Sequence, residues 1–252
     1  MNVSMSQAAA ALNANARWQE IIAENLASSS VPGFKKQELS LAAVQAGLMP
    51  AGSLNSGTPQ HFSIPKVGTS TSFAPGDIQF TGNKNDIAIE GKGFFQVSLP
   101  DGSTAATRDG EFQVNAKGQL TTKEGYAVLG DNGAIQLDPN NAGPVNISSS
   151  GMVSQGGETK GKLKLVEFSN PQLLTQVSGG YFIANDPKLQ TLGSTSTLRQ
   201  GYLESANTSV VREMANMMTA VRGFEANQHI ITMQDDRMGK VISDLGSPPS
   251  AN

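Results

Sequence analysis

Apolar residues near the end of the chain recur at alternating steps of four and three residues, which is the spacing of a coiled-coil seam. The pattern runs from Val210 to Leu245 and is interrupted only at Gln228 and Asp235. A long helix with one narrow apolar stripe needs a second helix, or another copy of the chain, to cover it. The pattern therefore predicts an assembly interface at Val210, Met214, Met217, Val221, Phe224, Ile231, Met238, Ile242 and Leu245.

The start of the chain repeats this spacing less strictly, and residues 7–26 are rich in the helix formers Ala, Gln, Glu, Arg and Leu. We expect this helix to end near Ser28 to Gly33, because Pro32 disfavours helix at Val31 and Gly33 can adopt a left-handed conformation. The residues of this helix assigned to the predicted interface are Met5, Leu12, Ile22 and Leu26.

The middle of the chain differs from both ends in composition and in its pattern of apolar residues. Residues 37–72 are rich in Ser, Gly, Thr, Ala and Pro, which predicts an extended arm with room for a short helix at Glu38 to Gln45. From Phe73 to Tyr202, short apolar runs alternate with turn residues, as in antiparallel β structure. The predicted strands are Asp86 to Glu90, Phe94 to Leu99, Ala106 to Arg108, Phe112 to Val114, Leu120 to Thr122, Ala127 to Leu129, Val145 to Ile147, Lys162 to Phe168 and Tyr181 to Ala184.

This order of elements predicts an α+β fold. Long N- and C-terminal helices would form a coiled-coil-like stem, and a mainly antiparallel β domain would be inserted between them. The predicted regions are an N-terminal helix and motif (1–36), an extended linker arm (37–72), a β domain (73–204) and a C-terminal helix (205–252).

Composition narrows the classes of function. The 252-residue chain has a formal charge of −3 and only one adjacent pair of basic residues, Lys35 and Lys36, which argues against nucleic-acid binding. It has no cysteine, which excludes disulfides and thiolate chemistry. We expect no membrane span, since no apolar run approaches the required length. The first residues lack the pattern of a signal peptide, so export would need another route.

Candidate chemistry is sparse. The two histidines, His61 and His229, are too few for a metal site built from imidazole ligands, and no G-x-S-x-G elbow accompanies them. The Gly91-Lys92-Gly93 segment lacks the further glycine and the Ser or Thr of a phosphate loop, so a turn explains it better. We therefore predict no catalytic residues, no metal site and no cofactor.

Several short segments share a pattern with one known family. They are Glu24 to Ser28, Val31 to Lys35, Asp86 to Phe95, Thr107 to Phe112, Gln200 to Asn207, Glu213 with Met214, and Arg222 to Asn227. Together they resemble the flagellar rod and hook proteins of bacteria, with Ser28 in place of the family's usual Asn. The resemblance singles out Asn25, Leu26, Ala27, Gly33, Phe34, Glu204, Asn207, Glu225 and Asn227 as family motif residues.

The resemblance implies a structural axial subunit of the flagellar basal-body rod, and not an enzyme. Such subunits polymerise through their terminal helices into a hollow helical shaft that transmits torque and conducts exported subunits. The implied partners are copies of the chain, other rod and hook proteins, and the flagellar type III export apparatus in transit. The implied location is the basal body in the periplasmic space, reached without a cleavable signal peptide.

The length favours a rod protein over a longer hook protein. The segment Ile64 to Thr69 lacks the Leu-Pro…Gly-x-Gly-Val stretch often seen in distal-rod proteins, which favours the proximal-rod subgroup over the distal-rod subgroup. A distal-rod or hook-type subunit is the first alternative. A surface β-domain adhesin with a coiled-coil stalk is the second, and the missing signal peptide and missing repeats argue against it.

Overall fold

The computed structural model describes residues 3–49, 60–139, 141 and 143–246. The chain forms two compact units, each built from stretches that are separate in sequence. The helical unit comprises Met1–Leu26, Gln37–Ser70 and Val210–Asn252, and the β unit comprises Ala27–Lys36 and Thr71–Ser209. The β unit therefore includes the short segment that follows the first helix.

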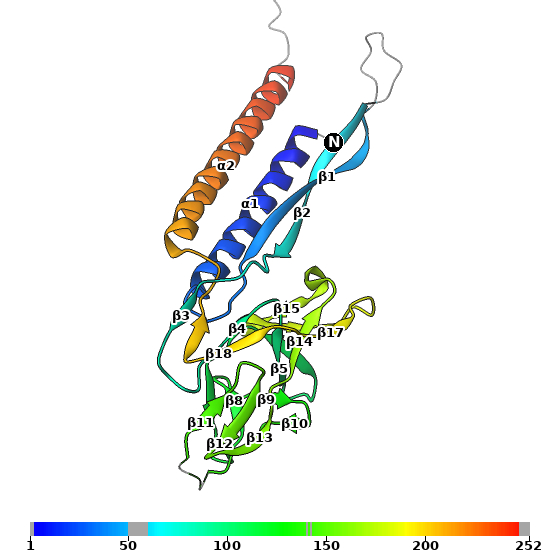
Figure 1. The fold of residues 1–252 in the computed structure, drawn as a ribbon. Coiled ribbons are helices and arrows are strands. Elements are labelled where there is room, and N and C mark those ends of the chain that lie inside the picture. Colours follow the sequence, from blue (N-terminus) through cyan, green and yellow to red (C-terminus); the bar gives the residue numbers. More distant parts are fainter. Residues whose placement is uncertain (1–2, 50–59, 140, 142, 247–252) are drawn as a thin grey trace, which may run out of the picture. The chain divides into compact units, whose positions relative to one another are not determined.

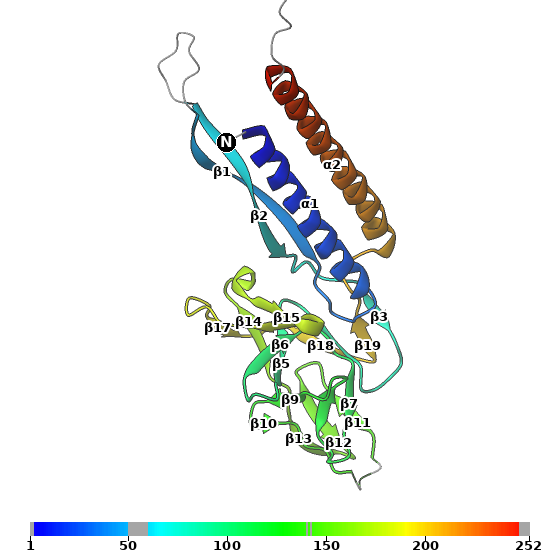
Figure 2. The same ribbon diagram turned by 180° about the vertical axis from the view of Figure 1, so that it is seen from behind.

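The helical unit contains one helix from each end of the described chain and two long strands. Helix α1 spans Val3–Ala27, helix α2 spans Val210–Gly246, and strands β1 (Gln37–Met49) and β2 (Gln60–Thr71) pair with each other. In both ribbon views α1 lies between α2 and this strand pair (Figures 1 and 2). Strand β1 occupies the segment for which the composition allowed a short helix, so that expectation is wrong.

The predicted coiled-coil-like stem is also wrong. The described chain has one helix near each end, a strand pair beside α1, and a large antiparallel β-sheet domain. Among the described side chains of α2, the buried and half-buried stripe differs from the predicted seam, with which it shares only Met217, Phe224 and Ile231. The stripe consists of Glu213, Asn216, Met217, Ala220, Gly223, Phe224, Asn227, Ile231 and Gln234.

Small residues explain why α2 packs on this other face. Ala220 is completely buried, and a Cβ added at Gly223 would lie 3.4 Å from the side chain of Asn15 in α1. Helices approach closely where side chains are small, so the face with Ala220 and Gly223 fits α1. The larger apolar side chains Met214 and Val221 are left 54% and 40% exposed.

The β unit is built from short antiparallel strands. Its strands are β3 (Ile78–Phe80), β4 (Ile87–Glu90), β5 (Phe94–Ser98), β6 (Thr104–Thr107), β7 (Phe112–Val114), β8 (Leu120–Thr122), β9 (Ala127–Gly130), β10 (Gly133–Ala134), β11 (Val145–Ile147), β12 (Met152–Gln155), β13 (Glu158–Lys162), β14 (Leu165–Phe168), β15 (Thr175–Val177), β16 (Tyr181–Ile183), β17 (Thr191–Gly193), β18 (Thr197–Gln200) and β19 (Tyr202–Glu204). Two 3₁₀ turns, at Pro171–Leu173 and Ser178–Gly180, flank β15.

These strands pair into one large sheet and three smaller ones. The large sheet has the order β15-β16-β6-β5-β9-β8-β7, with β10 pairing β9, and β14 pairing both β5 and β17. Strands β11, β12 and β13 form a second sheet, while β18 pairs β4 and β19 pairs β3. The β19–β3 ribbon sets Tyr202 opposite Phe80 and Glu204 opposite Ile78.

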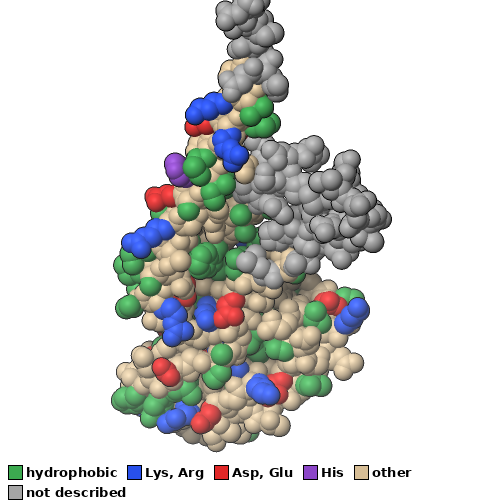
Figure 3. Space-filling view, turned by 90° about the horizontal axis from the view of Figure 1, so that it is seen from above, with side chains coloured by type: hydrophobic (Ala, Val, Ile, Leu, Met, Phe, Trp, Pro, Cys, Tyr) green, Lys and Arg blue, Asp and Glu red, His purple; other side chains and the backbone are tan. Residues whose placement is uncertain are grey.

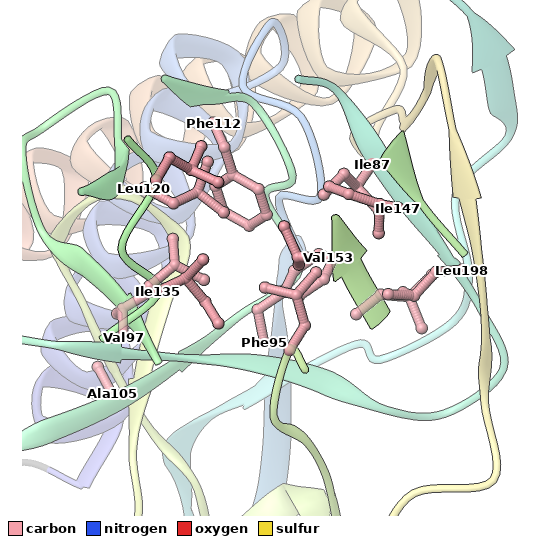
Figure 4. Close-up of a cluster of buried hydrophobic side chains, with 14 of the residues drawn as sticks. Ile87, Phe95, Val97, Ala105, Phe112, Leu120, Ile135, Ile147, Val153 and Leu198 are labelled. Atoms are coloured by element: carbon pink, nitrogen blue, oxygen red, sulfur yellow. The ribbon is translucent and has the colours of Figure 1, made fainter. Parts of the chain in front are cut away.

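Neighbouring side chains of β5 supply two separate cores. Successive residues of a strand point to opposite faces. Phe95 therefore joins the main cluster, where its ring packs edge-on to that of Phe112 at 4.9 Å, beside Ile87, Val153 and other buried side chains (Figure 4). Phe94 joins a smaller cluster on the other side, together with Phe182. Both faces of the sheet are thus covered around β5.

Candidate assembly site

Three buried charged side chains join distant parts of the β unit. The ammonium group of Lys35 donates to Glu204 Oε1 at 2.5 Å, and Arg108 Nη1 donates to Glu204 Oε2 at 3.3 Å. The backbone N–H of Gly76 donates to Glu204 Oε1 at 2.9 Å. Lys35, Arg108 and Glu204 are 1%, 6% and 2% exposed. One carboxylate therefore ties together segments that are far apart in the sequence.

Burial acts on both cations of this cluster. Desolvation lowers the pKa of Lys35, and the attraction of Glu204 offsets part of that effect. Desolvation likewise lowers the pKa of Arg108, again partly offset by Glu204. The cations also donate to backbone carbonyls, Lys35 Nζ to Ala74 O at 2.9 Å and Arg108 Nη2 to Gly91 O at 2.7 Å. Because both charges share one counter-ion, removal of Glu204 would leave two buried cations uncompensated.

The turn after α1 brings Lys35 to this cluster. Gly33 has a φ of 68°, and its N–H donates to the carbonyl of Glu204 at 2.7 Å. A Cβ on Gly33 would lie 2.3 Å from the carbonyl carbon of Arg108, so both the left-handed backbone and the close approach require glycine. Phe34 is 1% exposed, and its carbonyl accepts from the N–H of Asn207 at 3.2 Å.

Two asparagines of the motif hold backbone segments with their side chains. In the β unit, Asn207 Oδ1 accepts from the N–H of Lys36 at 2.7 Å, and Asn207 Nδ2 donates to Ser72 O at 2.7 Å. In the helical unit, the buried Asn25 exchanges two hydrogen bonds with the backbone of Gln37, both at 2.8 Å. Each site needs a donor and an acceptor on one short side chain, which a side-chain amide supplies.

A buried carboxyl group, Asp109, directly follows Arg108. It is 5% exposed, and its Oδ1 accepts from the N–H of Glu111 at 2.9 Å. Burial raises the pKa of Asp109 to about 7, although the Glu111 N–H works in the opposite direction. Asp109 therefore changes charge near neutral pH.

The first turns of α2 present apolar side chains to solvent. Val211, Met214 and Met218 are 78%, 54% and 58% exposed, and Val210 and Val221 beside them are also exposed. We call these five residues the α2 apolar face. The space-filling view shows hydrophobic side chains among charged ones along the helix (Figure 3). Contiguous exposed apolar side chains on a protein surface mark sites of interaction.

The residues assigned to the interface from the sequence lie in different environments. Ile22 is 1% exposed and so is already covered. The half-buried members are Leu12, Leu26, Met217, Phe224 and Ile231. The exposed members are Val210, Met214, Val221, Met238 and Ile242. The side chains of Met5 and Leu245 are outside what the structure describes. Their role at an interface between subunits stays a prediction.

The structure brings some motif residues together and leaves others apart. Gly33, Phe34, Glu204 and Asn207 meet in the β unit. The other motif residues are on the helices: Leu26 and Ala27 end α1, while Glu225 is exposed and Asn227 half-buried on α2. Sequence reasoning did not single out Lys35 or Arg108, although both lie inside the motif segments.

Other kinds of site find little support. Among the residues that the structure describes, no group of three or more His, Cys, Asp or Glu side chains could hold a metal ion. None of the described helices combines the length and apolar character needed to cross a membrane.

Two family models match the chain. The flagellar hook protein FlgE/F/G D1 domain matches residues 88–155, and the flagellar basal body rod FlgEFG protein C-terminal domain matches residues 199–245. The first match takes in β5 to β12, and the second takes in β19 and nearly all of α2.

Whole-chain relatives give the same result. The rod protein FlgG of Buchnera aphidicola subsp. Acyrthosiphon pisum is 33% identical, over 88% of this chain and 91% of its own. FlgG of Bacillus subtilis is 31% identical (89% and 92%), and FlgF of Caulobacter vibrioides is 32% identical (91% and 92%). The chain belongs to the family of flagellar basal-body rod proteins, structural components of the basal body and not enzymes.

Proposed function

We propose that the chain polymerises through its terminal helices, with copies of itself and with other rod and hook proteins, into a hollow helical shaft. The observation that carries this proposal is the α2 apolar face, which the rest of the described chain leaves exposed. Burying an apolar side chain of this size stabilises an assembly by about 1.5–3 kcal/mol when burial is complete. A contact between two different surfaces of identical subunits extends into a helical filament when the rotation does not close a ring.

In this proposal the shaft transmits torque and conducts exported subunits, and the chain reaches the periplasmic space through the flagellar type III export apparatus. The rod-protein names of the relatives support a place in such a shaft. Relatives named FlgG and FlgF match the chain at nearly the same identity, so the comparisons do not separate subgroups of rod proteins. The assignment to the proximal-rod subgroup therefore stays a prediction.

A charge placed on the α2 apolar face tests the proposal. Met218→Asp introduces a carboxylate at a side chain that is 58% exposed, so the subunit itself should fold normally. The matched control is Thr219→Asp, because its neighbouring exposed side chain points about 100° away around the helix. We expect the native chain and Thr219→Asp to form filaments with rising concentration, seen by sedimentation and electron microscopy, and Met218→Asp to remain monomeric. Filaments of normal length from Met218→Asp would overturn the role of this face.

A further inference from the structure

The β unit contains a cleft of about 650 Å³ whose lining includes Phe73, Phe94 and Phe168, which we call its aromatic floor. The rings of Phe73 and Phe168 both pack against Phe94, with centroids 5.9 and 5.6 Å apart. Arg108 lies over the same Phe94 ring at 4.9 Å, and Ile78 of β3 forms part of the wall. A cleft of this size and lining can take a large apolar side chain.

Arg108, beside the cleft, has one side-chain nitrogen without a hydrogen-bond partner among the described residues. Arg108 is 6% exposed and lines the cleft, and the nitrogen is its Nε. Its two terminal nitrogens are used by Glu204 and by the carbonyl of Gly91. A buried donor without a partner is costly. Because Nε is itself buried, it offers no contact to an occupant, and the apolar lining defines what the cleft can take.

The same unit presents an aromatic side chain of suitable size. Phe80, at the end of β3, is 72% exposed and packs edge-on against Tyr202, with ring centroids 5.2 Å apart. The guanidinium of Arg199 lies over the Tyr202 ring, 4.3 Å from its centroid. We call Phe80, Tyr202 and Arg199 the aromatic knob.

We propose that the aromatic knob of a second copy of this chain docks in the cleft, with Phe80 on the aromatic floor. Charge supports this occupant. Glu204 and Arg108 of the lining are buried together with Lys35, and the charged side chains that remain are the carboxylates Glu90 and Glu167 and the cation Lys92, so the rim carries more negative than positive charge. The knob contains the cation Arg199, and the exposed cation Lys84 is four residues after Phe80 in the sequence. Opposite charges at the rim of a contact steer and orient the partners.

Each copy offers both halves of this contact. Ile78 and Phe80 are two residues apart on β3 and so lie on the same face of the strand, with the cleft beginning at Ile78. Because Phe80 remains exposed, the cleft of the same copy does not accommodate it. A copy can give its knob to one neighbour and its cleft to another, which extends an assembly. The inference rests on the proposed function and adds a β-unit contact to that of the helices.

Photocrosslinking tests the contact directly. A chain with p-benzoyl-phenylalanine at position 80 keeps an aromatic group on the knob and is mixed with ¹⁵N-labelled native chain under conditions of assembly. We expect crosslinks from light to heavy chains, located by mass spectrometry in residues 91–94 and 167–171 of the heavy copy. The matched control carries the photoreactive residue at Val114, a 39% exposed apolar position on β7, and should give no crosslinks there.

Two further variants distinguish binding in the cleft from nonspecific association. Ser169→Trp alters an exposed residue of the cleft lining, so it should fold normally and reduce the light-to-heavy crosslinks at least about tenfold, as loss of an interface hot spot does. Phe80→Ser should weaken association of the β units by a similar factor. Crosslinks confined to other surfaces, or unchanged by Ser169→Trp, would overturn the inference.

The outcome also distinguishes the inference from the proposed function. Filaments without crosslinks in the cleft would overturn the knob contact and leave polymerisation through the helices intact. Crosslinks without filaments would support the knob contact and overturn polymerisation. The absence of both would overturn both.

Discussion

Removing the carboxylate of Glu204 should destabilise the β unit more than any surface charge change. The carboxylate is 2% exposed and accepts from Lys35, Arg108 and the N–H of Gly76. Breaking a buried ion pair by removing one partner costs about 3–5 kcal/mol, because it leaves a buried charge without compensation. Glu204 serves two cations, so we expect Glu204→Ala to cost about 4–5 kcal/mol.

The natural chromophores allow this to be measured in the intact chain. The three tyrosines, Tyr126, Tyr181 and Tyr202, are all in the β unit, whereas the single tryptophan, Trp18, is in α1. Urea unfolding followed by the near-ultraviolet circular dichroism of tyrosine therefore reports on the β unit, while tryptophan fluorescence reports on the helical unit. The expected result is a large shift of the tyrosine transition to lower urea.

Two comparisons make the measurement decisive. Glu158→Ala breaks an exposed pair with Lys160 and should cost under about 1 kcal/mol. The double variant Lys35→Met with Glu204→Gln should be more stable than Glu204→Gln alone, because it removes one of the two stranded charges. If Glu204→Ala costs no more than Glu158→Ala, the ion cluster does not hold the β unit together and the reasoning fails.

Asp109 and Gly110 follow Arg108 in the sequence, and a substitution at each should change the stability of the β unit in its own way. The native pKa of Asp109 is about 7 against an ordinary 3.8, so the folded state keeps a proton that the unfolded state releases between these values. Stability should therefore fall by on the order of 4 kcal/mol as pH rises from about 4 to above 7, and Asp109→Asn should abolish this slope in urea titrations; an unchanged slope would contradict the burial argument. Gly110→Ala would place a Cβ 1.8 Å from the carbonyl oxygen of Ile87 and should cost about 3 kcal/mol or more, whereas Gly193→Ala, with open space around it, should be near neutral. Equal unfolding midpoints for the two alanine variants would show that the backbone at Ile87 can move away from the added Cβ at little cost in free energy.

Local patterns predicted the strands whose apolar residues are bounded by tight turns. Strands β7 and β8 have the predicted bounds, and their hairpin turns at Gly118, which has a φ of 80°. The predicted strand from Lys162 to Phe168 is instead the end of β13 followed by β14. The sequence of β13, ETKGK, has no apolar alternation to mark it. Such strands form because neighbouring backbone pairs with them, which a single-sequence pattern does not contain.

The ion cluster of Lys35, Arg108 and Glu204 could not be predicted from the sequence, for a different reason. Lys35 and Glu204 are 169 positions apart, and each looks like an ordinary surface residue by composition. The family resemblance singled out Glu204 but gave it no partner. Only folding shows that Gly33, by allowing close approach to the Arg108 backbone, positions Lys35 beside the carboxylate. Long-range polar contacts of this kind depend on the assembled backbone and not on local propensity.

The C-terminal helix shows how apolar periodicity can predict a helix and still give the wrong architecture. Apolar spacing reports which side chains would gain from leaving water, but it does not say which neighbour covers them. Within one chain α1 takes the face with Ala220 and Gly223, where small side chains permit close packing, and the larger Met214 and Met218 stay exposed. A monomer gains nothing from that exposure, since a patch of this kind favours aggregation. In the proposed assembly a subunit does gain, because its intramolecular packing leaves these apolar side chains exposed for the next copy.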